Sequence, residues 1–104
     1  MHNPRRLKLH EELKRILGNS NVYFQPPESI KLKYPCIIYS YQRPDIKKAN
    51  NHMYRLVRNY QLTYVTKEPG SEMADRILNE FEMISMSRVF TSDNMNHYIY
   101  SLYY

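Results

Sequence analysis

The sequence predicts an α+β fold in which two helices pack on one face of a mainly antiparallel sheet. Two segments place apolar residues at helical spacing, and five further segments of strand length are alternating or continuously apolar. Their order along the chain is helix, strand, strand, strand, helix, strand, strand. A chain of 104 residues has room for one hydrophobic core, so we expect a single domain over residues 1–104.

The first helix is predicted over residues 4–17. Asn3 is a favourable N-cap residue, Pro4 suits the first helical position, and Gly18 suits a left-handed end. One face of this helix enters the core through its apolar residues, Leu9, Leu13, Ile16 and Leu17.

Three basic residues, Arg5, Arg6 and Lys8, crowd the positive end of this helix dipole. That placement is mildly unfavourable, by about a few tenths of a kcal/mol per charge at an exposed end. Two interpretations are open. The three side chains contact an acidic surface or a phosphate, or a solvated helix end tolerates them.

Three strands are predicted next, over residues 22–25, 36–41 and 54–67. The dipeptide Pro26-Pro27 ends the first, because proline cannot continue a central strand. The second is apolar on both faces, and the third alternates as a half-buried strand does. Residues 43–53 are polar and form either an extended loop or the tip of a long hairpin.

The second helix is predicted over residues 71–84, after a break at Pro69-Gly70 and with Ser71 as its N-cap. The last two strands are predicted over residues 87–91 and 97–103. A turn rich in Asp and Asn joins them, because these residues tolerate unusual backbone angles.

Tyrosine is in excess, with 11 Tyr in the chain, and none of them falls within a predicted helix. Tyrosine has a high β-propensity, which by itself places it in strands. Its side chain also buries a large area while its hydroxyl can remain hydrated, which suits an interface on the uncovered sheet face. Both explanations remain open, and the terminal HYIYSLYY, which includes Tyr103 and Tyr104, favours an interface.

Charge is divided unevenly along the chain. Residues 1–67 hold 13 basic and 4 acidic residues, net +9, whereas residues 68–104 hold 2 basic and 6 acidic, net −4, for a total of +5. This division suits nucleic acid or an acidic partner, and it equally suits subunits that meet head to tail. If the two regions pair across subunits, Glu80 and Glu82 belong to the acidic side of that contact.

A catalytic role finds little support, and we expect neither an enzyme nor a cofactor. The sequence has no HExxH, CxxC, GxSxG or glycine-rich phosphate loop. The single cysteine, Cys36, precedes two Ile in an apolar strand, where burial makes a thiol inert. His52 and His97 lie on separate segments without a nearby Cys, so no metal site is expected. Asp45, Glu68 and Asp93 sit beside turn residues, where an acidic side chain needs no catalytic reason.

We expect no membrane segment, because no apolar run approaches 18 residues and the start lacks the apolar stretch of a signal peptide. The lone cysteine fits a reducing compartment. These features predict a soluble intracellular product.

Nucleic-acid binding is the alternative function. Basic residues interleave with aromatic ones over residues 54–60, and proteins with a sheet platform stack bases on aromatic side chains while Lys and Arg neutralise phosphates. The sequence lacks the glycine and phenylalanine consensus of ribonucleoprotein motifs, and an ordinary exposed strand has the same composition.

The order of landmarks resembles the small tail terminator, or tail completion, proteins of long-tailed bacteriophages, and also the neighbouring neck proteins. The resemblance covers nearly the whole chain and consists of landmarks, not of a catalytic signature. After the N-terminal helix the landmarks are Val22–Pro27, Tyr34–Tyr39, Asn50–Tyr54, Tyr60–Tyr64 before Pro69-Gly70-Ser71, Asp93–Tyr98 and Leu102–Tyr104.

The resemblance implies a structural virion protein, assembled in the host cytoplasm, that forms a ring, usually a hexamer. Such a ring caps the finished tail tube, stops its polymerisation and offers a surface to the head connector or head-completion protein. DNA would cross the lumen without sequence-specific binding, so we expect most Lys and Arg side chains, Arg55 and Arg58 included, to point away from it. Candidate contact residues for ring stacking are Arg5, Arg6 and Lys8 and the loop residues Arg43, Asp45, Lys47 and Lys48. Tyr103 and Tyr104, at the C-terminal edge, are further candidate interface residues.

Overall fold

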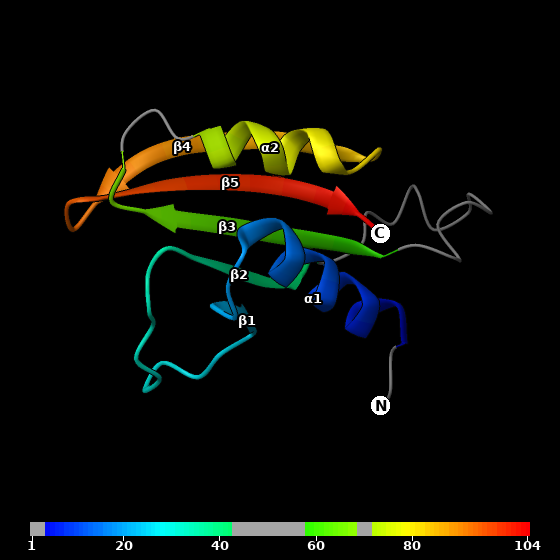
Figure 1. Ribbon diagram of the computed structural model, residues 1–104, viewed down its shortest axis with the longest axis horizontal. Coiled ribbons are helices and arrows are strands. Elements are labelled where there is room, and N and C mark those ends of the chain that lie inside the picture. The colour runs from blue at the N-terminus through cyan, green and yellow to red at the C-terminus, as the bar shows by residue number, and fades with distance from the viewer. Residues whose placement is uncertain (1–3, 43–57, 69–71) are drawn as a thin grey trace.

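The computed structural model describes residues 4–42, 58–68 and 72–104. Within them the order of elements is the predicted one, with two helices and five strands forming an α+β fold (Figure 1). The expected loop 43–53, the first part of the strand expected over 54–67, and the caps Asn3 and Ser71 lie outside the described residues.

The five strands form one mixed sheet of order β1-β2-β3-β5-β4. Strands β1 (Val22–Phe24) and β2 (Cys36–Tyr41) pair in parallel, whereas every other pair is antiparallel. Strand β3 (Asn59–Thr66) is central, so its two neighbours β2 and β5 (Met95–Tyr103) satisfy both of its edges. Strands β1 and β4 (Ile84–Ser92) are therefore the two edges of the sheet.

The first helix, α1 (Pro4–Leu17), has the predicted bounds and buries the four predicted residues, Leu9, Leu13, Ile16 and Leu17. It ends at Gly18, whose φ of 81° lies in the left-handed region that glycine adopts without strain. The Gly18 amide donates a hydrogen bond of 2.9 Å to the Lys14 carbonyl, which closes the last turn.

The second helix, α2 (Glu72–Glu80), ends before the predicted limit at residue 84. Ile84 continues the apolar pattern of the helix, yet it pairs with Leu102 of β5 as the first residue of β4. An apolar side chain at this position fits both a helical and a strand pattern, and the pairing with Leu102 makes it part of the strand. Strand β4 is consequently longer than the segment 87–91 that the sequence predicts.

A tight turn at Asp93 and Asn94 joins β4 to β5. Both residues have positive φ, 53° and 63°, the pair of left-handed angles that a type I′ hairpin turn requires. The Asp and Asn that predict this turn are therefore the residues that adopt its unusual backbone angles. The hairpin contains one irregularity in register, between Met86 and Arg88.

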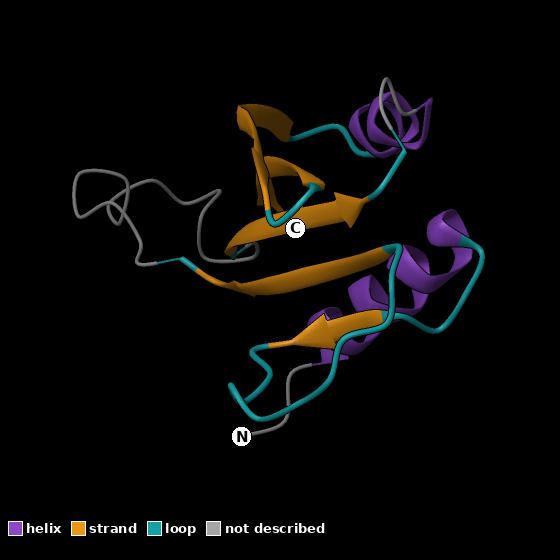
Figure 2. Cartoon of the chain, turned by 90° about the vertical axis from the view of Figure 1, so that its left-hand side faces the viewer, coloured by secondary structure: helices purple, strands orange, loops and turns teal. Residues whose placement is uncertain are grey.

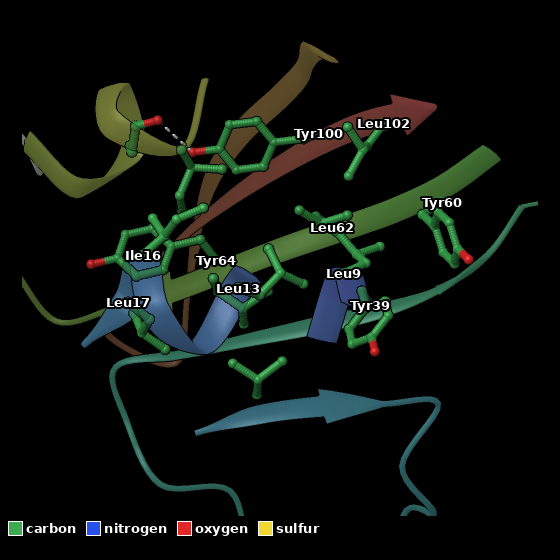
Figure 3. Packing of buried hydrophobic residues seen from close by; sticks show 14 residues of the cluster. Leu9, Leu13, Ile16, Leu17, Tyr39, Tyr60, Leu62, Tyr64, Tyr100 and Leu102 are labelled. Atoms are coloured by element: carbon green, nitrogen blue, oxygen red, sulfur yellow. Dashed lines mark hydrogen bonds between the residues drawn. The ribbon is translucent and has the colours of Figure 1, made fainter. Parts of the chain in front are cut away.

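Both helices cover the same face of the sheet (Figure 2). The hydrophobic core lies between them and the strands, and Figure 3 shows the side chains of α1 meeting those of the central strands. Strand residues of one parity enter this core, Tyr60, Leu62 and Tyr64 from β3 and Tyr100 and Leu102 from β5.

Candidate interaction surface

Four tyrosines are core residues. Tyr39, Tyr60, Tyr64 and Tyr100 are each exposed by 4 % or less and face the helices. Burial raises the pKa of Tyr39 and Tyr100, since the phenolate would lose its hydration. For these four residues the interface explanation is wrong, because strand alternation directs them into the core.

The Tyr100 hydroxyl is satisfied within the fold. It donates a hydrogen bond of 2.9 Å to the backbone carbonyl of Ala74 in α2 (Figure 3). A buried hydroxyl without a partner destabilises a core, so this bond lets a tyrosine occupy a position where Phe would otherwise be expected.

The opposite sheet face has no helix over it (Figure 2). Register places Ile38, Thr63 and Ile99 in one row across β2, β3 and β5, and all three are half-buried. Polar residues flank this row, among them Ser40, Gln61 and Ser101. On the described strands, the tyrosines of this face are Tyr23 and Tyr103. The face is therefore a mixed apolar and polar surface and not a platform of aromatic rings.

The basic start of α1 packs on aromatic rings. The Arg6 guanidinium lies 4.3 Å from the centroid of the Phe24 ring and donates to the Tyr39 hydroxyl at 3.3 Å. The Arg5 guanidinium lies 5.1 Å from the centroid of the Tyr104 ring. Aromatic faces attract cations, which explains how this helix tolerates positive charge in a first turn that has no acidic residue.

Arg5 and Arg6 are thus attached to the sheet by their own chain, while Lys8 is exposed. The sequence did not predict the cluster of Arg6, Phe24, Tyr39 and His10. Its only sequence signal is that Arg6 and His10 are four residues apart, beside the apolar stripe of the helix.

The C-terminal tyrosines have different surroundings. Tyr103 lies on the uncovered face and is half-buried. Tyr104 meets the Phe81 ring edge to face, with 6.0 Å between centroids, and burial raises its pKa. Its backbone exchanges two hydrogen bonds of 3.0 Å with Arg58, whose side chain is exposed.

The acidic candidates also differ from each other. Glu80 accepts a hydrogen bond of 3.3 Å from Arg15, which also pairs with Glu12 at 2.9 Å. These carboxylates raise the pKa of Arg15. Part of the charge complementarity expected between subunits is therefore used within one chain, where it joins α2 to α1. Glu82 is exposed just after α2.

The loop candidates Arg43, Asp45, Lys47 and Lys48, like Arg55 and His52, lie outside the described residues. Within the described part of the chain, no three His, Cys, Asp or Glu side chains gather in a way that could hold a metal ion. Cys36 is fully buried, and desolvation raises the pKa of its thiol to about 11. A thiol in this state is a poor nucleophile at neutral pH.

Across residues 4–42, 58–68 and 72–104, no helix is long and apolar enough to span a membrane. Comparison with protein-family models, with curated proteins and with solved structures finds no match to this chain.

Proposed function

We propose that this chain is a structural subunit of a bacteriophage tail or neck, and specifically a tail terminator. It forms a ring, usually of six copies, at the head-proximal end of the tail, where it stops polymerisation of the tube. The same ring joins the tail to the head connector or head-completion protein, and the mature location is the virion.

One observation supports this proposal most. The helices cover a single face of the sheet, and the outer edge of its nine-residue strand β4 pairs with no described strand, while the connection after β1 reaches part of the other face, where the Lys33 amide donates to the Tyr23 hydroxyl. A small subunit of this kind gains burial by packing against neighbours. The landmark resemblance over nearly the whole chain supplies the particular assembly.

The alternative, a small nucleic-acid-binding module, depends on tyrosines displayed on the sheet. Four of them are core residues, and the described strands display Tyr23 and Tyr103 on the uncovered face. The sheet therefore offers this alternative less support than the sequence alone does. It remains an outcome of the test below.

The test mixes the full chain with a tail tube protein from the same genome and follows tube growth by light scattering. The proposal predicts that growth stops in a manner that depends on the concentration of this chain. Binding of a single-stranded oligonucleotide is measured in parallel against salt concentration. Unchanged tube growth together with strong binding that falls steeply with salt would replace the proposal by the alternative.

A further inference from the structure

Strand β4 is a long sheet edge with little protection against pairing. It has nine residues, Ile84–Ser92, and contains no Pro, Gly, Lys, Asp or Glu. Natural edges are usually short or blocked by lysine, proline or an inward charge, because their free backbone groups otherwise pair with another strand. Here the protective features are Arg88 and the irregularity beside it, and Val89 is 53 % exposed.

The backbone groups that β4 directs outward can be identified from the register. Tyr104, just after β5, exchanges two backbone hydrogen bonds with Arg58, just before β3. Because successive residues of a strand bond to opposite neighbours, the even-numbered residues of β5 bond to β3 and the odd-numbered residues bond to β4. Val89 and Thr91 are opposite even-numbered partners, Tyr98 and Asn96, and therefore direct their N–H and C=O groups away from the sheet. Both residues have their side chains on the helix-covered face.

The opposite edge, β1, has matching geometry. Asn21 and Gln25 bond inward to β2, so Val22 and Phe24 direct their backbone groups outward. Their side chains also lie on the helix-covered face. Because β1 and β4 run in opposite directions within one subunit, placing two copies side by side in the same orientation brings β4 antiparallel to β1.

Charge favours this head-to-tail contact over a two-fold contact between two β4 strands. The helix beside β4 is α2, whose charged residues are Glu72, Asp75, Arg76 and Glu80. Two β4 strands paired about a two-fold axis would bring two acidic helices together and place both Arg88 side chains near the centre. The β1 side is basic instead, with exposed Lys31 and Lys33 against one exposed acid, Glu28, in the connection after β1, whereas Lys14 on α1 is already paired with Glu11 at 3.2 Å.

We infer that the outer edge of β4 and its acidic α2 flank bind the β1 edge and its basic flank on a second copy of this chain. This inference rests on the proposed function, for which it supplies the contact between neighbouring ring subunits. Such a contact is heterologous, the class of contact that builds a ring when the rotation between successive copies closes. Because β1 has three residues, it can pair with only part of β4. The charged flanks then determine which strand binds β4 and in which direction it runs.

The test uses two single variants of the full chain, Tyr23→Cys on β1 and Phe90→Cys on β4, and a short bismaleimide that links thiols. Both side chains lie on the uncovered face, so they approach each other in the inferred contact. Cross-linked dimers are expected when the two variants are mixed, and not with either variant alone. The unsubstituted chain is the control, since its Cys36 is fully buried.

The possible outcomes separate this inference from the proposed function. Cross-linking of Phe90→Cys by itself would establish a two-fold contact and overturn the inference. Rings on tail tubes without cross-linking of the mixture would also overturn it and leave the proposed function standing. The absence of both rings and cross-links would overturn both.

Discussion

The Nδ1 atom of His10 lies 2.7 Å from the hydroxyl oxygen of Tyr39, which joins α1 to β2. Arg6 donates to the same oxygen, and a neutral His10 whose Nδ1 carries no proton accepts the hydrogen bond of the Tyr39 hydroxyl. This direction requires His10 to be neutral. Burial lowers the pKa of His10, and Lys14 and Arg6 lower it further, against an opposing effect of Glu11.

The fold is accordingly expected to lose stability in mild acid. A histidine with a lowered pKa in the folded state binds its proton more readily when unfolded, so protonation favours unfolding. Its stabilising contribution is complete above the ordinary value of 6.5 and declines as the pH falls through 6.5 toward the lowered pKa. Thermal unfolding between pH 8 and 5 measures this. An identical pH dependence in His10→Gln would contradict the assignment.

The Tyr100 hydroxyl is expected to stabilise the fold through its bond to the Ala74 carbonyl. Replacing Tyr100 by Phe should lower the free energy of unfolding by about 1 kcal/mol, the usual contribution of a buried hydrogen bond. Urea unfolding of Tyr100→Phe measures the change. Tyr98→Phe is the matched control, because Tyr98 is half-buried on the same strand, and an equal loss in the two variants would contradict this role.

Cys36 is expected to be unreactive in the folded chain. Its side chain is fully buried and its thiol has a pKa raised to about 11, so both access and thiolate formation are suppressed at pH 8. A chromogenic disulfide reagent should react slowly without denaturant and rapidly in guanidinium chloride. Equal rates under the two conditions would show that β2 is not packed as described.

The two acidic candidates near the end of α2 are expected to respond differently to charge reversal. Glu80→Lys removes the contact with Arg15 and should shift thermal unfolding slightly, since exposed ion pairs contribute little. Glu82→Lys leaves that contact intact and reports on charge between subunits. Sedimentation of both variants with tube protein checks the pairing idea, and unimpaired assembly of Glu82→Lys would remove Glu82 from the contact.

The local elements could be predicted because their signals are local. Pro4, Gly18 and the apolar stripe fix α1, and the apolar run from Cys36 fixes β2. The end of α2 could not be predicted, since Ile84 fits a helical stripe as well as it fits a strand opposite Leu102. Parallel pairing of β1 with β2 depends on the path of the connection between them, residues 25–35, and no local sequence pattern predicts that path.

The candidate surface was harder to predict than the fold. The sequence shows that tyrosines belong to strands, but only the register shows that Tyr60 and Tyr64 face the helices. Likewise, three basic residues at a helix start indicate a charged surface. The structure shows that two of them contact aromatic rings that are distant in sequence, Arg5 the ring of Tyr104 and Arg6 the ring of Phe24.

If this chain is the proposed tail terminator, it caps a phage tail tube as a ring. Negative-stain electron microscopy of tail tubes assembled with the full chain tests it most directly. We expect a ring at one end of each tube and tubes that no longer elongate when fresh tube protein is added. Bare tube ends and continued elongation, at concentrations where the chain is folded, would contradict it.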